Sequence, residues 1–148
     1  MRQDWSAFNN VGLCAAAIAN IVEHCGSLPV SKALLIMPLI MHDATLTFLS
    51  KGNIRRREVA ALVSVKPELF ANFNDRFENS LVLSLNSIQL LAHLGYVRIQ
   101  GDVLPVKPIL IGPDFGRRAE RIVRATPNIA VILSSPIEEL YLNFRIQL

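Results

Sequence analysis

Charged residues are scarce in this sequence, and cysteines are rarer still. Charged side chains make up 18% of the 148 residues, where typical soluble domains have ~25%, and the net charge is only +3. A positive charge this weak does not by itself predict nucleic-acid binding. The two cysteines, Cys14 and Cys25, fall about three turns apart in one predicted helix, which is too far for a disulfide. We therefore interpret them as thiols of a reducing cytosol.

Long apolar runs are missing as well. The most apolar segment, Ala33–Met41, is far shorter than the ~20 residues of a membrane-spanning helix, and Pro38 interrupts it. Near the N-terminus, Arg2 is accompanied by Asp4, and no signal-like apolar block follows directly. We expect a cytoplasmic protein without a membrane segment.

Recognisable catalytic and metal-binding motifs are also lacking. His24, His42 and His93 stand singly on apolar helices, without a partner at metal-ligand spacing. The sequence contains no Cys-x-x-Cys, no His-Glu-x-x-His and no phosphate-binding glycine loop. We therefore expect a non-enzymatic protein with no catalytic residues, no cofactor and no metal, and an enzyme of unrecognised type stays open as a third hypothesis.

Apolar side chains, in contrast, are abundant. They make up 51% of the chain, or about 54% once glycine is added and tyrosine removed, where typical domains have ~45–50%. A domain this small has too much surface to hide them all. Some should then lie on a surface that another protein covers. The alternative is an unusually apolar monomer with scattered surface leucines.

The spacing of the apolar residues predicts a mainly α (α+β) fold. The expected N-terminal elements are an arm with Trp5 and Phe8, a helix over 11–24 capped by Asn10 and ended by Gly26, and an apolar segment over 32–42 that Ser31 caps and Pro38 kinks or splits. Further along, the pattern predicts a helix over 54–63 capped by Asn53, then one helix from Pro67 to Leu94, or two with a break near Leu83.

The pattern changes after Gly95. Alternating residues predict a β-hairpin, with strands over 96–99 and 103–106, and Pro105 should confine the second strand to a sheet edge. A helix is then expected from Pro113 to about 125, where Pro127 breaks it. An apolar stretch over 129–133 and a last helix capped by Ser135 follow.

A helix that ends in glycine and continues into a short hairpin is the layout of a winged helix. We therefore expect a helical bundle with a winged-helix-like unit and one short β-hairpin. The predicted organisation is one domain over 1–148, with N-terminal helices over 1–52, the winged-helix-like unit over 53–107 and C-terminal helices over 108–148.

The arginines form two groups. The first group is Arg117, Arg118, Arg121 and Arg124. Arg117, Arg121 and Arg124 are spaced i, i+4 and i+7, which predicts a stripe along one side of a helix. Such a stripe can bind DNA phosphates, bind an acidic partner surface, or face solvent. For Arg55–Arg57 we favour a solvated face, because positive charge opposes the dipole at a helix N-terminus. The segment before Gly95, where a winged helix reads DNA, contains no arginine or lysine over 85–93.

Three patterns between residues 10 and 96 carry a family resemblance. They are an apolar helix starting at Asn10; Leu28-Pro29 followed by an apolar run that contains Pro38 and ends in His42; and Phe73-Asn74-Asp75-Arg76-Phe77 leading into Ser84–Leu91 and Gly95-Tyr96. Together they resemble the middle component of bacterial three-component ABC systems, which include Lamassu-type anti-phage defence. Two positions depart from the family pattern: Val11 replaces a proline, and Leu46 follows Thr45 where an arginine is common.

The resemblance implies an adaptor subunit, similar to kleisin and winged-helix subunits of SMC complexes, that joins an SMC-like ABC ATPase to an effector such as a nuclease. It would contact DNA mainly through the complex. The family-pattern core positions are Leu34, Leu35, Pro38, Leu39 and His42. We expect the hairpin to form part of a docking surface, with candidate contacts Tyr96, Arg98, Ile99 and Val103. The alternative is a small winged-helix DNA-binding regulator that uses the arginine stripe.

Overall fold

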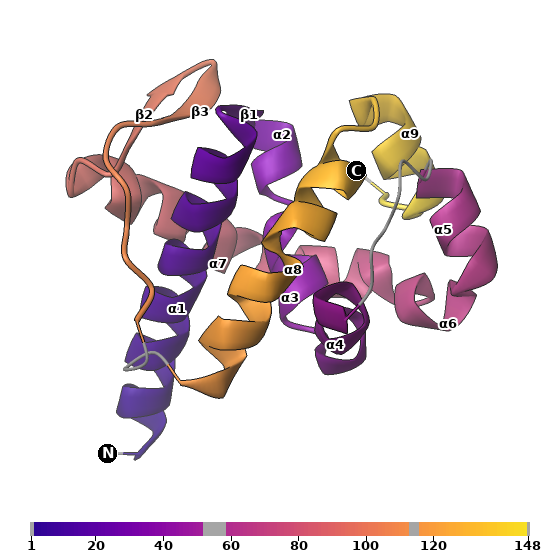
Figure 1. The fold of residues 1–148 in the computed structure, drawn as a ribbon, viewed down its shortest axis with the longest axis horizontal. Helices are drawn as coiled ribbons and strands as arrows, with labels where there is room; N and C mark the ends of the chain where they lie inside the picture. Colours follow the sequence, from indigo (N-terminus) through magenta and orange to yellow (C-terminus); the bar gives the residue numbers. More distant parts are fainter. Residues whose placement is uncertain (1, 52–58, 113–115, 148) are drawn as a thin grey trace.

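The fold is mainly helical with one small sheet, which confirms the predicted mainly α (α+β) class (Figure 1). The computed structural model describes residues 2–51, 59–112 and 116–147, and only the backbone for residues 2–10. Its elements are α1 (Arg2–Cys25), β1 (Leu28–Pro29), α2 (Val30–Ala33), α3 (Ile36–Ile40), α4 (Asp43–Lys51), α5 (Val59–Val65), α6 (Pro67–Phe70), α7 (Phe73–His93), β2 (Val97–Gln100), β3 (Asp102–Pro105), α8 (Arg117–Leu133) and α9 (Ile137–Asn143).

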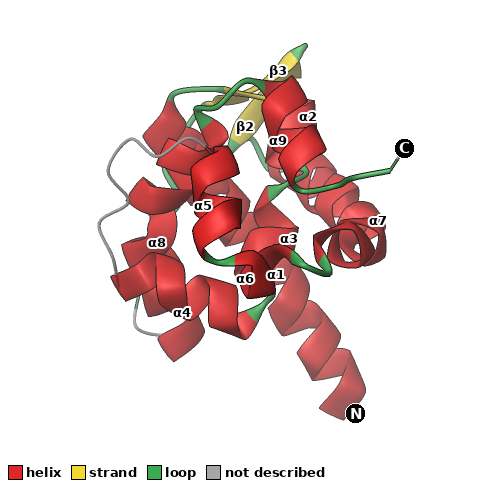
Figure 2. Ribbon diagram, turned by 90° about the vertical axis from the view of Figure 1, so that its right-hand side faces the viewer, coloured by secondary structure: helices red, strands yellow, loops and turns green. Residues whose placement is uncertain are grey.

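The long helices α1, α7 and α8 build the body of the protein. Helix α1 packs against both α7 and α8, and α4 packs against α8. Figure 1 shows α1 and α8 side by side with α7 crossing behind them. Helices α5, α6 and α9 lie together on the right-hand side of that view. Figure 2 shows the N-terminal turns of α1 projecting beyond the other elements.

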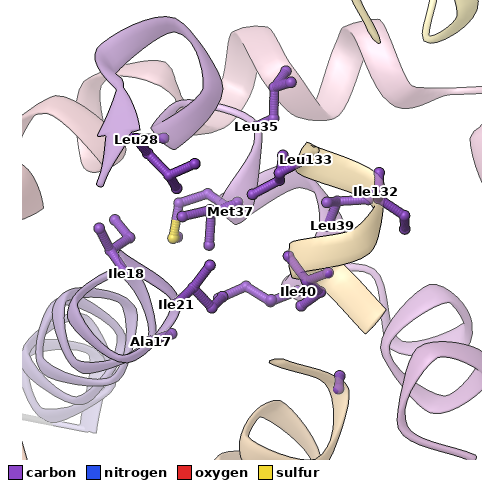
Figure 3. Packing of buried hydrophobic residues seen from close by; sticks show 14 of the residues in the cluster. Ala17, Ile18, Ile21, Leu28, Leu35, Met37, Leu39, Ile40, Ile132 and Leu133 are labelled. Carbon is purple, nitrogen blue, oxygen red and sulfur yellow. The ribbon is translucent and has the colours of Figure 1, made fainter. Parts of the chain in front are cut away.

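The apolar segment of the family pattern lies in the centre of the core. All five residues of α3 are buried, and Met37, Leu39 and Ile40 lie between Ile18 and Ile21 of α1 and the end of α8 (Figure 3). The chain's own helices therefore cover this segment. Each such side chain contributes roughly 1.5–3 kcal/mol by leaving water.

Pro38 splits this segment, as predicted, and the break lies one turn before the proline. Helix α2 ends at Ala33 and α3 begins at Ile36. A proline has no N–H to donate to the carbonyl four residues back, and its ring clashes with that carbonyl. That position is Leu34, so the backbone tightens there and Leu35 N donates to the Lys32 carbonyl at 3.0 Å.

The predicted start of the first helix is wrong. Helix α1 runs without interruption from Arg2, so the expected arm is helical and Asn10 lies inside the helix. Asparagine costs less than about 1 kcal/mol in a helix interior, and each added residue gains one more backbone hydrogen bond. Gly26 ends the helix as predicted, with φ of +86°.

The junction before α7 also differs from the prediction. Pro67 occupies the first turn of α6 as expected, but the chain breaks at Ala71–Asn72, and α7 continues through Leu83. The end of α7 at Gly95 is confirmed. Tyr96 N donates to the Leu91 carbonyl at 2.9 Å and Gly95 has φ of +83°, the left-handed conformation that glycine adopts without strain.

The sheet consists of the predicted hairpin and a third strand. Strands β2 and β3 pair across Gly101, and β1 adds to the other side of β3, giving the order β1-β3-β2. The prediction that Pro105 marks an edge strand is wrong, because β3 is central. Pro105 stands at the last position of β3 opposite Val97, and β1 pairs only with Val103 and Asp102, so the missing N–H interrupts no pair with β1.

The helix–glycine–hairpin order expected of a winged-helix-like unit is present in α7, β2 and β3. The third strand, however, comes from residues 28–29, outside the predicted 53–107 unit. The winged-helix assignment and the division of the chain into three stretches remain predictions.

Pro127 does not break α8, which contradicts the prediction. The helix continues to Leu133, and the residues before and after the proline bury one continuous face. That burial offsets the roughly 3 kcal/mol that an interior proline costs. The helix begins at Arg117 after Gly116 (φ +89°), and the expected start at Pro113 lies outside the described residues.

The other predicted caps have different outcomes. Ser31 and Ser135 do not cap, because α2 and α9 each follow directly on a proline and have no side-chain cap. Asn53 and the start of the helix expected over 54–63 lie outside the described residues, and α5 extends beyond that range to Val65.

Candidate protein-interaction surfaces

A polar corner joins α3, α4, α6 and α7 around His42. The His42 Nδ1 atom lies 2.7 Å from the Thr45 hydroxyl, which donates to the Leu69 carbonyl at 3.3 Å. Because a hydroxyl has one hydrogen, His42 Nδ1 then donates to Thr45. Arg76 donates to the same Leu69 carbonyl at 2.6 Å and to the Pro38 carbonyl at 3.2 Å. Residues from two separate family patterns therefore meet in one network.

Burial and a neighbouring cation both disfavour the protonated form of His42. Burial lowers the pKa of His42, the nearby Arg76 cation lowers it further, and the Asp43 carboxylate acts in the opposite direction. Burial also lowers the pKa of Arg76, whose guanidinium lies 5.3 Å from the centre of the Phe73 ring. Thr45 and Arg76 therefore hold the Leu69 and Pro38 carbonyls in place, so we assign this network a role in stability.

Of the four arginines predicted on helix α8, two are half-buried and contact other helices, and two are exposed to solvent. Arg118 donates to the carbonyls of Ile40 and Met41 at the end of α3, at 3.4 and 3.1 Å. A cation is favourable at this end of a helix. Arg121 pairs with Asp43 at 2.9 Å and donates to the Thr47 hydroxyl at 3.0 Å.

The remaining arginines of the stripe point outward. Arg117 and Arg124 are exposed, and Arg124 lies 3.7 Å from Glu120 on the same helix. Arg121, the central residue of the stripe, is thus bound to Asp43 and Thr47 of α4. Two exposed cations, Arg117 and Arg124, remain on α8. Arg55–Arg57 lie outside the described residues.

The hairpin presents only part of the predicted docking set. Arg98 is exposed, Ile99 is 43% exposed, and half-buried Tyr96 has the Lys107 ammonium 4.5 Å from its ring centre. Val103 is fully buried, so the prediction that it contacts a partner is wrong. It occupies the central strand, with Leu28 and Ile99 as neighbours on either side.

Comparison of the sequence with models of known protein families identifies the family of this chain. A family model described as ABC-three component (ABC-3C) system Middle Component 3 matches residues 8–145. The chain belongs to this family. It is therefore a middle component of an ABC-three component system, as the resemblance implied. No curated protein and no solved structure matches the chain.

The family-pattern residues of this middle component are mostly internal. Leu35, Pro38 and Leu39 are buried, whereas Leu34 and His42 are half-buried at the margin of the core. Among the described residues, no single helix is long and apolar enough to span a membrane. The segments Val30–Ile40 and Asp43–Lys51 reach that length and composition only together, across a 99° bend.

Surface hollows on the middle component are open and lie mainly along α8. One of about 370 Å³ is lined by Ile111, Gly112, Glu120, Val123 and Arg124. A second of about 380 Å³ lies at the Pro127 position, and its lining includes His24 and Glu23, both of which are exposed. No three potential metal-ligating side chains come together within the described residues.

A surface that sequence reasoning missed is the outer side of α7. Val82 is 69% exposed there, and Leu85 and Leu90 are exposed as well. The signal was present in the sequence, because no Asp, Glu, Lys or Arg occurs between Glu78 and Arg98. Depletion of charge on an exposed helix is typical of the centre of an interface.

Proposed function

We propose that this protein is a non-enzymatic adaptor that connects an SMC-like ABC ATPase to an effector such as a nuclease, within a Lamassu-type anti-phage defence complex in the cytoplasm. The observation that carries the proposal is the match to a middle-component family over residues 8–145, which implies other components as partners. The adaptor relays the state of the ATPase to the effector, and it meets DNA mainly through the complex.

The surface of the protein supports this role. Large aliphatic side chains remain exposed on several elements; among the described residues Leu110 is 86% and Val106 57% exposed. Both follow the hairpin, where Arg98 and Ile99 are exposed too. An adaptor needs exposed apolar side chains, since they hold other subunits without any chemistry.

The test is co-expression with an SMC-like ABC ATPase whose gene neighbours the gene of this protein. We expect the two proteins to co-purify, and we expect Ile99→Asp to weaken the complex at least tenfold, because it places a carboxylate in an apolar contact. Leu142→Asp on α9 is the matched control, since Leu142 is 76% exposed and lies outside the hairpin. Failure of the ATPase and the wild-type chain to co-purify, with both soluble, would overturn the proposal.

The competing DNA-binding hypothesis predicts a different affinity of the purified chain for duplex DNA. A winged-helix regulator would bind duplex DNA through the exposed arginines, with an affinity that falls steeply with salt. The adaptor proposal expects the isolated chain to bind duplex DNA weakly and Arg117→Ala/Arg124→Ala to change that little. Strong, salt-sensitive binding that the double substitution abolishes would favour the regulator.

A further inference from the structure

The surface hollow at Pro127 lies between α1 and α8, which pack side by side (Figure 1). Its volume is about 380 Å³. Each helix lines it with residues at positions i, i+3 and i+4, a spacing that places side chains on one side of a helix. These residues are Asn20, Glu23 and His24 of α1, and Val123, Thr126 and Pro127 of α8. The two helices therefore each turn one side toward the same space.

A hydrogen bond between the two helices leaves one amide oxygen free at this hollow. The buried Thr126 donates its single hydroxyl hydrogen to the Ile122 carbonyl at 2.8 Å. Its oxygen must therefore accept from the Asn20 amide nitrogen, which lies 2.8 Å away. This contact fixes the orientation of the Asn20 amide. The amide oxygen makes no hydrogen bond within the described residues, so it is available as an acceptor.

Pro127 creates a second free acceptor. In a helix each carbonyl points along the axis toward the N–H of the residue four positions later. Residue 127 has no N–H, so the Val123 carbonyl has no helical donor, and it lies between two residues that both line the hollow. Proline is the least favourable residue inside a helix, so this acceptor exists at the expense of stability.

The carboxylate of Glu23 gives the hollow a negative charge. Its side chain is exposed, and neither ion pair in the described part of the chain involves it. Glu23 stands in the last turn of α1, where the partial negative charge of the helix end disfavours a carboxylate and favours a cation. No lysine or arginine is among the described residues that line the hollow. A cation bound here would relieve the repulsion between Glu23 and the end of α1.

We propose that this hollow binds the guanidinium group of an arginine side chain from another component of the ABC-three component system. Its acceptors belong to Asn20, Glu23 and Val123 and come from two helices, and a guanidinium spreads five N–H donors in one plane. His24 adds an acceptor nitrogen when its ring is neutral. The inference rests on the proposed adaptor function for the protein that brings the arginine.

The lining favours a guanidinium over an ammonium group. The exposed Pro127 ring and the exposed Val123 side chain supply an apolar surface for the flat, weakly hydrated face of a guanidinium. An ammonium group is compact and more strongly hydrated, so it gains less from such a surface. Arginine is also enriched at protein interfaces, where lysine is depleted.

The test titrates the isotope-labelled full-length chain with N-acetyl-arginine amide at constant ionic strength. It follows the NMR signals of the Asn20 side-chain amide and of the α8 backbone amides. A single side chain binds weakly, so we expect a dissociation constant on the order of millimolar. N-acetyl-citrulline amide has the same shape without the charge and should bind about tenfold more weakly. N-acetyl-lysine amide should bind about threefold more weakly.

Three variants separate the contributions to binding. Glu23→Gln should weaken binding of the arginine derivative about tenfold, because it removes the charge and keeps the size of the side chain. Glu138→Gln on α9 is the matched control and should leave binding unchanged, since Glu138 is exposed and does not line the hollow. Pro127→Ala should weaken binding about threefold, because the alanine N–H occupies the Val123 carbonyl. Weaker binding by a variant at least as stable as wild type distinguishes a binding role of Pro127 from a structural one.

Signals at the hollow that do not move with the arginine derivative overturn the proposal. Equal binding of the citrulline or the lysine derivative also overturns it, as does binding that Glu23→Gln or Pro127→Ala leaves unchanged. In the assembled complex, Glu23→Gln should weaken the attachment of one other component about tenfold, and unchanged attachment of every component would show that none supplies the arginine. Failure of the adaptor proposal is a separate result, because a wild-type chain that co-purifies with no other component would still bind the arginine derivative.

Discussion

Buried hydroxyl groups on this protein fall into two kinds. Thr45 is fully buried and links His42 to the Leu69 carbonyl, whereas Ser84 and Ser87 are fully buried on α7 and their hydroxyls have no hydrogen-bond partner within the described residues. A buried polar group without a partner costs about 1–3 kcal/mol, and one with a partner returns a net ~1 kcal/mol. The two kinds should therefore respond oppositely to removal.

We expect Thr45→Val to lower the free energy of unfolding by about 1–2 kcal/mol, because the isosteric side chain leaves the His42 Nδ1–H without its acceptor. Ser84→Ala is the control: it removes a hydroxyl that bonds to nothing and improves helix propensity, so stability should stay equal or rise by up to about 1 kcal/mol. Urea unfolding monitored by circular dichroism measures both. Equal losses in the two variants would contradict the hydrogen-bond assignment.

We expect His42 to make the stability of the protein depend on pH. Its pKa in the folded state is lowered, so the unfolded chain, with a histidine pKa near 6.5, binds the proton more readily. Stability from this group is complete above about pH 6.5 and is lost as the pH falls from there through the folded-state pKa. The cause is burial first and the Arg76 cation second.

We therefore expect His42→Gln to reduce the loss of stability between about pH 7.5 and pH 5.5. Glutamine keeps a donor for Thr45 but does not titrate. The midpoint of urea unfolding, measured for both proteins at each pH, tests this. An unchanged pH dependence in the variant would show that His42 is not the group responsible.

Helix α8 illustrates how tertiary packing overrides a local signal. Its proline at 127 leaves the carbonyl of Val123 without its helical donor, yet the buried face continues across it from Ile122 to Ile129. Thr126 donates to the Ile122 carbonyl at 2.8 Å and accepts from Asn20 of α1 at 2.8 Å, which ties this part of α8 to α1.

We predict that Pro127→Ala raises the free energy of unfolding by about 1–3 kcal/mol, because alanine restores the missing backbone bond and has the best helix propensity. Thermal unfolding gives the direction, and urea unfolding gives the size. A loss of stability in the variant would mean instead that the packing of α8 on α1 and α4 depends on a bend at the proline.

The elements that could be predicted from sequence are those with a strong local cause. Gly95 has a left-handed φ that only glycine adopts easily, Pro38 removes a specific backbone bond, and apolar and polar residue types alternate in the sequence over Val97–Gln100. Strand β1 has two residues, Leu28 and Pro29, and exists only because β3 lies beside it. Such a strand has no pattern of its own to detect.

At the candidate surfaces, too, features with a local cause could be predicted, and features that depend on residues distant in sequence could not. The spacing of the arginines correctly predicted a cationic helix, but nothing in the spacing indicates that Arg118 and Arg121 turn to the α3–α4 corner, because those contacts join residues far apart in the sequence. Val103 was misplaced for a similar reason: its burial depends on β1. The exposed aliphatic residues of α7 could have been found, since the lack of charged residues between Glu78 and Arg98 is visible in the sequence.

The protein as a whole leaves a substantial apolar surface uncovered. Within the described residues, large aliphatic side chains are more than half exposed on α5, α7, α9 and the segment after β3, and the most exposed of each are Val65, Val82, Leu142 and Leu110. Composition alone could not say where these side chains lie, and that a partner covers them stays a prediction. The buried part, in contrast, forms one hydrophobic cluster that draws on all three predicted stretches of the chain.

Because β1 pairs with β3, the two halves of the chain depend on each other during synthesis. Residues 28–29 leave the ribosome long before 102–103, and they have no strand to join until the hairpin emerges. Until β3 has been synthesised, the N-terminal helices therefore lack part of their packing, and some of their apolar side chains stay in contact with water. A nascent chain stalled before the hairpin would accordingly be a natural client for chaperones.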